Sequence, residues 1–332
     1  MLLCTHQVHY SSVHSSERSI SAPDTNLSPI SSLLITPKTD SVRVMTLNLW
    51  YKSDQRAERH IIAGRLAAAL NVDVLLVQEL QELPSDSVEQ TLNVIGKTSG
   101  LTLAATSPEV SATSSHPPVA VFSRLPFQTH EPVKYSSIAM PSQYAALASV
   151  RTRANRDLLV VSAHLSWGGK GEYTRLRQVV TLDQEISRIL GNEMAPACLG
   201  GDLNSLPQSS TIRYLTGLDS YEGESTQWAD AFALAGIGDG VTSTSANPWA
   251  RVTAERHGFL DTYALPDRRI DYIMVRGYPY GRPFAPQIAF SVSADMLHAL
   301  LPDVDFPPSD HNAVVCDLWD PPLDYVQNTN QV

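Results

Sequence analysis

The sequence has few cysteines, three in 332 residues, and it has no long hydrophobic run. An odd and sparse set of cysteines does not build a disulfide framework, so we expect Cys4, Cys198 and Cys316 to be free thiols. A membrane-spanning helix needs about 20 consecutive apolar residues, and no segment approaches that length. The first residues also lack the basic and apolar regions of a secretory signal, which favours a cytoplasmic location.

Basic residues are scarce as well: the chain has 24 Lys and Arg against 34 Asp and Glu, which gives a net charge of -10. A protein that grips duplex nucleic acid through many phosphates needs a broad basic surface. The composition therefore disfavours that mode of binding but leaves room for a local basic rim. Hydrophobic residues make up 43% of the chain, enough for a substantial core, and we expect a monomeric globular protein.

The chain divides into three parts by composition. Residues 1–40 are rich in Ser, Thr and Pro without a sustained period, which predicts a disordered leader. Residues 41–320 carry the alternating apolar patterns of a folded domain, and residues 321–332 form a C-terminal tail. Within the domain, Gly and Pro punctuate residues 217–266, which predicts a surface excursion beside the site.

Strand and helix patterns alternate along the domain. Residues 42–50 alternate apolar and polar side chains, residues 60–70 have helical spacing, and residues 72–79 form a continuous apolar strand. A further helix is expected at 173–190, with strands at 119–122, 158–164, 197–200, 269–275 and 313–318. Neighbouring strands joined by the polar turn 154–157, with no helix between them, imply antiparallel pairing. The pattern therefore predicts an α/β fold with mixed sheets.

Short polar clusters stand at the ends of these apolar runs. In chain order they are Asn48, Gln78-Glu79, His164, Asp202-Leu203-Asn204, Arg269-Ile270-Asp271-Tyr272 and Ser309-Asp310-His311. Open α/β sheets present their chemistry at strand ends. Carboxylates, amides and two histidines delivered in this way are typical of a metal-assisted phosphate-ester hydrolase.

These clusters resemble the motifs of the endonuclease/exonuclease/phosphatase superfamily, whose members include deoxyribonucleases, sphingomyelinases and deadenylases. The resemblance covers Val42 to Trp319, and its motifs are Thr46-Leu47-Asn48, Leu76-Val77-Gln78-Glu79, Ser162-Ala163-His164-Leu165, Gly201-Asp202-Leu203-Asn204-Ser205, Arg269-Ile270-Asp271-Tyr272-Ile273 and Ser309-Asp310-His311. It implies a four-layered α/β sandwich, two packed mixed sheets flanked by helices, with the site at one end of the sheets.

A magnesium site is expected around Glu79. This carboxylate ends a strand of Val and Leu, where a charge is tolerated only if it faces a cleft, so we take it as the principal metal ligand. Asp310 is the second expected ligand, and Asn48 either orients Glu79 or touches the ion. Mg²⁺ prefers hard oxygen donors, and Mn²⁺ is the alternative. A surface carboxylate at a strand end is the structural alternative for Glu79.

Asp202 and Asn204 lie one residue apart on an extended segment, so their side chains point the same way and can reach one phosphate. The glycines before them, Gly200-Gly201, would let backbone approach a ligand. The resemblance implies that Asp202 aligns or activates the attacking water and that Asn204 bonds a phosphate oxygen.

Two histidines are expected to be catalytic: His164 ends an apolar strand, and His311 lies in a sharp loop after Pro307-Pro308. Asp271 within an apolar strand would be costly unpaired, so we expect it to pair with His311 and fix its tautomer. The resemblance implies that His164 contacts the phosphate and can protonate the leaving oxygen. A satisfied core histidine is the alternative for His164. Arg175 and Gln178, on the helix that follows, are expected to support the site from outside.

Two features bear on the substrate. Pancreatic-type deoxyribonucleases carry an acidic partner for a catalytic histidine just before the strand at 119–122, whereas this chain has Ser115-His116-Pro117-Pro118. Three aromatic residues, Trp228, Trp249 and Tyr272, could stack on a base or line a pocket, with core packing as the alternative.

The leading functional prediction is a magnesium-dependent phosphodiesterase that hydrolyses its substrate by in-line attack of water. Nucleic acid is the first substrate class, and a phospholipid, as in sphingomyelinases, or a small phosphate ester is the second. The alternative from a different class is a non-catalytic protein that uses the fold as a binding platform.

Overall fold

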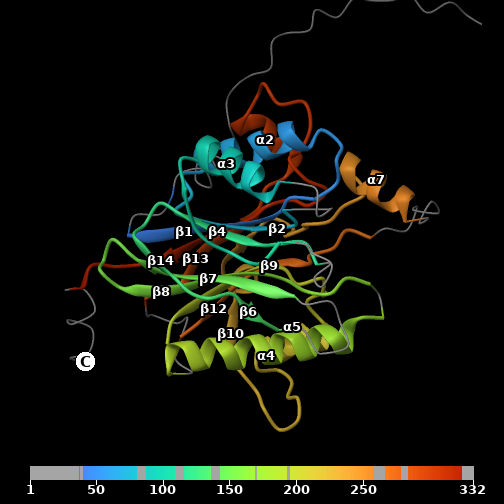
Figure 1. Cartoon of the computed structure of the whole chain (residues 1–332). Coiled ribbons are helices and arrows are strands. Elements are labelled where there is room, and N and C mark those ends of the chain that lie inside the picture. Colours follow the sequence, from blue (N-terminus) through green and yellow to red (C-terminus); the bar gives the residue numbers. More distant parts are fainter. Residues whose placement is uncertain are drawn as a thin grey trace, which may run out of the picture.

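The computed structural model describes residues 37, 40–80, 87–109, 116–135, 143–168, 170–192, 195–257, 266–277 and 283–323. Most of the predicted leader and most of the predicted tail lie outside these residues. Two seven-stranded mixed sheets face one another, and helices cover their outer faces (Figure 1). The expected α/β architecture of four layers is confirmed.

Sheet I contains the first strand of the domain near its centre. Its order is β11 (Gly236–Ile237), β13 (Pro286–Ser291), β14 (Val314–Trp319), β1 (Ser41–Asn48), β2 (Val74–Gln78), β4 (Ala120–Ser123) and β3 (Thr102–Thr106). β1 pairs parallel with β2 and antiparallel with β14. The crossover from β1 to β2 runs through α2 (Arg56–Ala69), so both strands end at the same edge of the sheet.

Sheet II repeats this arrangement. Its order is β10 (Trp228–Asp230), β12 (Asp271–Arg276), β9 (Ala197–Asp202), β8 (Asp157–His164), β7 (Tyr144–Arg151) and β5 (Phe127–Thr129), with β6 (Val133–Lys134) also paired to β7. β8 and β9 are parallel and are joined through α4 (Glu172–Leu190). β7 and β8 are antiparallel across the turn at 152–156, as the sequence predicts.

Three apolar layers hold the four structural layers together. Val44, Leu76, Val160 and Cys198 belong to the cluster between the sheets. Outside sheet I the core is completed by α2, α3 (Val88–Ser99) and α8 (Ala294–Leu300), and outside sheet II by α4 and α5 (Ser210–Leu215). Cys198 and Cys316 are free and buried, as expected.

The double glycine of β9 serves packing rather than access of a ligand. A Cβ on Gly200 would lie 2.5 Å from the side chain of Leu76 in the opposite sheet. Gly201 has a φ of 154°, and a Cβ there would collide with the carbonyl of Ala163 on β8. The expectation that these glycines admit a ligand is therefore wrong, because strands of the protein itself occupy the space.

The segment 217–266 is more than the surface excursion that its Gly and Pro content predicted. It supplies β10 to sheet II, β11 to sheet I, and the helices α6 (Ala231–Ala235) and α7 (Pro248–Arg256). Trp228 is 2% exposed and its indole N–H donates to Asp183, so this residue belongs to the core. The sequence did not predict these strands because short edge strands carry little periodic signal.

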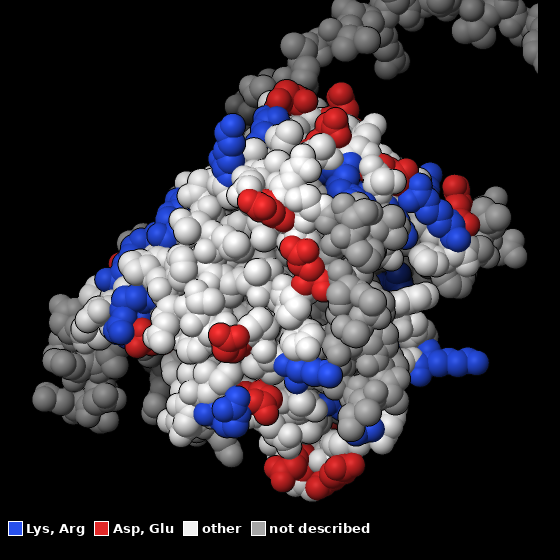
Figure 2. All heavy atoms as spheres, in the orientation of Figure 1, with Lys and Arg blue, Asp and Glu red and all other residues white. Residues whose placement is uncertain are grey.

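The surface charges are mixed. On the face in Figure 2, acidic and basic side chains of the described residues are scattered among uncharged ones, and neither sign forms a broad patch there. None of the described helices combines the length and the apolar character that crossing a bilayer requires.

His60 makes the fold sensitive to acid. It is 3% exposed on α2, and burial, followed by the charge of Arg59, lowers its pKa to about 3. An unfolded histidine titrates near pH 6.5, so the unfolded state binds more protons between these values and stability falls as pH drops below about 6.5. Between pH 7 and pH 5, urea unfolding should show that the protein loses about 2 kcal/mol more than its His60→Leu variant. Parallel losses in the two proteins would contradict this expectation.

Candidate active site

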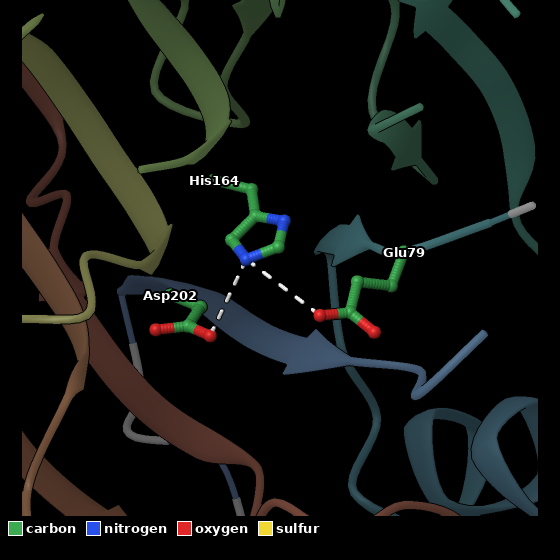
Figure 3. A group of neighbouring side chains, drawn as sticks. All are labelled: Glu79, His164 and Asp202. Atoms are coloured by element: carbon green, nitrogen blue, oxygen red, sulfur yellow. Dashed lines mark ion pairs between the residues drawn. The ribbon is translucent and has the colours of Figure 1, made fainter. Parts of the chain in front are cut away.

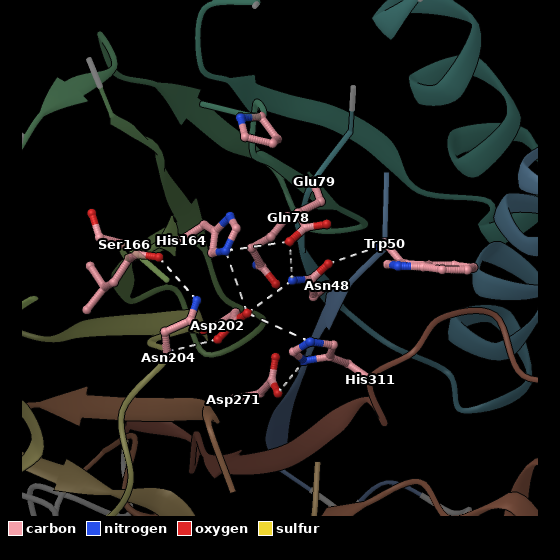
Figure 4. Close-up of polar contacts among 12 residues, drawn as sticks. Asn48, Trp50, Gln78, Glu79, His164, Ser166, Asp202, Asn204, Asp271 and His311 are labelled. Atoms are coloured by element: carbon pink, nitrogen blue, oxygen red, sulfur yellow. Dashed lines mark hydrogen bonds and ion pairs between the residues drawn. The ribbon is translucent and has the colours of Figure 1, made fainter. Parts of the chain in front are cut away.

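The predicted site residues converge where the two parallel strand pairs end. Asn48 and Glu79 come from the carboxyl ends of β1 and β2, and His164 and Asp202 from those of β8 and β9 (Figure 4). In sheet II, Asp202 is the register partner of both His164 and Asp271, because β12 begins where β9 ends. Each sheet therefore brings its polar residues to the same end of the sandwich.

Asn48 joins the two sheets at this end. Its Nδ2 donates to Oε1 of Glu79 at 3.0 Å and to Oδ2 of Asp202 at 3.1 Å. Its Oδ1 accepts the backbone N–H of Trp50 at 2.9 Å. In this arrangement the amide nitrogen faces the site, so Asn48 orients the two carboxylates, and its role as a metal ligand stays a prediction.

Glu79, His164 and Asp202 form a compact group (Figure 3). Nε2 of His164 lies 3.6 Å from Oε1 of Glu79 and 3.6 Å from Oδ2 of Asp202. Burial raises the pKa of Glu79, and the neighbouring His164 and the hydrogen bond from Asn48 oppose that shift. Glu79 also has a φ of 59°, a left-handed conformation that is strained for a residue with a side chain.

Asp271 and His311 form the pair that the sequence predicted. Nδ1 of His311 lies 2.8 Å from Oδ2 of Asp271, and Nε2 lies 3.9 Å from Oδ2 of Asp202. Burial alone would lower the pKa of His311, but the carboxylates of Asp271, Asp310 and Asp202 outweigh it and raise that pKa well above its usual range. Burial likewise raises the pKa of Asp271.

Asn204 is held by the strand ends around it. Its backbone N–H donates to Oδ1 of Asp202 at 2.8 Å, and its Nδ2 donates to the carbonyl of Leu165 at 3.2 Å. It has a φ of 49°, which asparagine tolerates better than most residues. Asn204 therefore fixes the Asp202 carboxylate and stands beside the loop that leaves His164.

Asp310 is positioned by α7, from the segment that was expected to be a surface excursion. The hydroxyl of Thr253 donates to its Oδ2 at 2.8 Å, and its Oδ1 lies 3.8 Å from Nε2 of His311. Its negative charge contributes to the raised pKa of Glu79. Asp310 and Glu79 therefore act on the same small region of the site.

Comparison with known proteins agrees with this geometry. The model of the endonuclease/exonuclease/phosphatase family matches residues 45–311. The chain belongs to this family. Members of the family are hydrolases that act on phosphoester bonds, and they are typically metal-dependent.

Individual relatives are distant. Protein angel of Drosophila melanogaster is 30% identical over 123 residues, which is 33% of this chain and 34% of that protein. The match thus spans about a third of that relative. The family member from Bacteroides vulgatus has 18% identity and a TM-score of 0.60 over 84% of this chain and 98% of its own. The human Nocturnin catalytic domain, solved with a bound sulfate anion, has 17% identity and a TM-score of 0.57 over 85% and 95%. At these identities the structural likeness shows the shared fold.

The donors in this family member suit an oxygen-preferring divalent cation. Two groups of three ligand atoms lie within 4.8 Å of one another: Glu79, His164 and Asp202, and Asp202, Asp271 and His311. Oδ1 of Asp271 is buried, and no partner for it exists among the described residues. A set dominated by carboxylates fits Mg²⁺ or Mn²⁺ better than a sulfur-rich site would.

Arg59 organises the site although no motif marked it. Its guanidinium donates to five backbone carbonyls, those of Asp54, Leu49, Pro308, Trp50 and Lys52. It thereby ties the loop after Asn48 to the loop before Asp310. In sequence it is one arginine on an amphipathic helix, so only the tertiary contacts reveal its role.

Three other residues support the site from outside. Arg175 donates to the carbonyls of Ser166 and Gly168 at 3.1 and 2.9 Å, and Gln178 accepts the Ser166 N–H at 3.0 Å. The hydroxyl of Tyr135, which sequence reasoning missed, donates to the carbonyl of His164. These bonds fix the backbone at His164 and in the residues that follow it.

The aromatic residues singled out from the sequence do not form an open platform. Trp249 lies 5.3 Å from Trp50 between ring centroids and donates its indole N–H to the carbonyl of Pro307. Tyr272 is 1% exposed, and its hydroxyl donates to the carbonyl of Ser205. Packing is therefore their observed role.

Replacing Arg59 by lysine should damage the fold and the site together. Lysine offers three donors from a single point, so it cannot reach five carbonyls spread over two loops. We expect Arg59→Lys to lower the free energy of unfolding by about 2–4 kcal/mol. The control is Arg65→Lys on the same helix, whose exposed ion pair with Asp303 should be worth under about 1 kcal/mol. Equal effects of the two substitutions in urea unfolding would refute this role for Arg59.

Proposed function

We propose that this family member is a magnesium-dependent phosphodiesterase. The observation that carries the proposal is the environment of one oxygen, Oδ2 of Asp202. Nε2 of His164 lies 3.6 Å from it, Nε2 of His311 lies 3.9 Å from it, and the Asn48 amide holds it at 3.1 Å. Two imidazoles that converge on one fixed carboxylate can flank a phosphate whose attacking water the carboxylate aligns.

Asp202 is the group proposed to act on water. Its Oδ1 is held by the Asn204 N–H at 2.8 Å, so its orientation is set before the substrate arrives. It would accept a hydrogen bond from the attacking water and draw its proton as the oxygen attacks phosphorus. A fixed carboxylate avoids the reorganisation that a mobile one would need in each turnover.

The two histidines are proposed to act on opposite sides of the reaction. His311, whose pKa is raised by its three neighbouring carboxylates, is protonated at neutral pH and would donate to a non-bridging phosphate oxygen as negative charge builds there. His164 would donate a proton from Nε2 to the leaving oxygen. Asp271 keeps the His311 ring oriented through its bond to Nδ1.

Glu79 and Asp310 are the proposed carboxylate ligands of the metal. A magnesium ion bound there would neutralise charge on the phosphate and polarise it as a Lewis acid. The donors reach the site from different strands and loops, and Asn48 and Thr253 restrain two of them by hydrogen bonds.

Nucleic acid is the proposed substrate class, in keeping with the nucleases that give the family its name. The interspersed surface charges and the net charge of -10 favour a short or single-stranded segment over a long duplex. A phospholipid or a small phosphate ester is the second class.

Hydrolysis of bis-(4-nitrophenyl) phosphate tests the reaction. With Mg²⁺ or Mn²⁺ the protein should release nitrophenol, and Asp202→Asn and His311→Ala should each lower kcat by about 100-fold or more. The matched control is Asp305→Asn, an exposed carboxylate in the loop that carries Asp310. If the protein turned over neither this diester nor oligonucleotides nor phospholipids with any divalent metal, the proposal would be wrong.

Metal binding can be tested without turnover. Titration calorimetry with MnCl₂ should show binding that Glu79→Gln weakens by about tenfold or more, because it removes one charged oxygen donor. Glu89→Gln, at an exposed position in the first turn of α3, should bind like the unaltered protein. Metal binding that is unchanged in Glu79→Gln would reject this ligand, and no binding at all would favour the non-catalytic platform.

A further inference from the structure

His116 packs directly against His164, beside the group of Glu79, His164 and Asp202. The ring centroids are 4.7 Å apart and the ring planes are inclined by 57°. Nε2 of His116 and Nδ1 of His164 are both buried, and neither has a hydrogen-bond partner in the described part of the chain. The two unsatisfied nitrogens therefore belong to neighbouring rings.

Two unsatisfied buried nitrogens are costly. A buried polar atom without a partner loses its hydrogen bonds to water and gains none in return, and native proteins leave few such atoms without a reason. A direct contact between the two nitrogens removes this cost only if one of them donates and the other accepts. A small rotation of the rings would close that contact.

The donor and the acceptor can be assigned from the surroundings. Nδ1 of His116 lies 3.2 Å from the carbonyl of Pro117, and a carbonyl only accepts, so Nδ1 carries the hydrogen. Burial, followed by the charge of His164, lowers the pKa of His116 well below its usual range, so the ring is neutral. A neutral imidazole with hydrogen on Nδ1 has an acceptor at Nε2. The donor must then be Nδ1 of His164.

We propose that His116 is a positioning residue that accepts a hydrogen bond from Nδ1 of His164, which leaves Nε2 of His164 as its proton-transferring atom. The inference rests on the proposed phosphodiesterase function. When His164 gives its Nε2 proton to the leaving oxygen, the P–O bond breaks and the product alcohol carries that proton. The neutral ring keeps its Nδ1–H on His116 and does not reorient.

Without His116 the neutral tautomer should reverse. Nε2 of His164 faces two carboxylate oxygens, each 3.6 Å away, and these would draw the single hydrogen of a neutral ring to Nε2. An acceptor at Nδ1 opposes that pull. Tyr135 and Arg175 hold the backbone around His164, whereas His116 places a second ring with an unsatisfied nitrogen against its imidazole.

Kinetics of substituted proteins test the role. His116→Phe keeps a ring but removes the acceptor, and it should lower kcat on bis-(4-nitrophenyl) phosphate by about 10- to 100-fold with little change in KM. His116→Gln offers a side-chain oxygen to Nδ1 and should recover about tenfold of that loss. His130→Phe is the matched control, because that histidine bonds Ser149 on the edge of sheet II. Wild-type kcat in His116→Phe, or no recovery in His116→Gln, would overturn the proposal.

Nitrogen NMR of ¹⁵N-histidine-labelled protein gives an answer that does not depend on activity. The signals of His164, assigned with His164→Gln, should show the Nδ1–H tautomer for the neutral ring and the Nε2–H tautomer in His116→Phe. An Nε2–H tautomer in the unaltered protein would overturn the inference. An inactive protein with the Nδ1–H tautomer would instead reject the phosphodiesterase and keep the contact.

Discussion

The bond of one amide to two carboxylates governs this site. Asn48 is fully buried and belongs to sheet I, yet its Nδ2 reaches Asp202 in sheet II as well as Glu79 beside it. The carboxylates repel one another, and a shared donor lowers the cost of keeping both ionised in a buried position. Since Asp202 is also the register partner of His164 and Asp271, the position of Asn48 sets where the sheet II residues stand relative to Glu79.

That bond requires the sheets to approach closely at this end. Gly200 permits the approach, because a side chain there would meet Leu76. Just beyond it, Nε2 of Gln78 donates to the hydroxyl of Ser162 at 3.0 Å, and that hydroxyl donates to the carbonyl of Val77, so a polar bridge replaces apolar packing. A larger residue at position 200 would separate the sheets and stretch the amide bond at the same time. The distance between the sheets therefore determines both the packing of the core and the bond from Asn48 to Asp202.

Sequence reasoning predicted those residues whose position follows from local periodicity. Glu79, His164 and Asp202 end apolar strands, and parallel strands joined by a helix must end at one edge, so their convergence could be inferred. Arg59 and His116 could not be found in this way. Arg59 occupies an ordinary helical position, and His116 was noticed only as the absence of an acid. Arg59 bonds a carbonyl 249 residues away, and His116 packs against the ring of a distant residue, His164; such contacts leave no periodic trace.

The charge of the site links its chemistry to stability. Burial raises the pKa of Glu79 and of Asp271, so the folded protein holds their protons more tightly than the unfolded chain and loses stability as pH rises and they ionise. The raised pKa of His311 changes stability in the same direction. The protonated ring stabilises the folded state at low pH, and this stabilisation is lost as the ring deprotonates. A cation bound only by the folded state would restore part of that loss in proportion to the logarithm of its concentration. Glu79 also has a left-handed backbone, and such strain persists only where the surrounding structure holds the residue in place, as the Asn48 bond does for the Glu79 carboxylate.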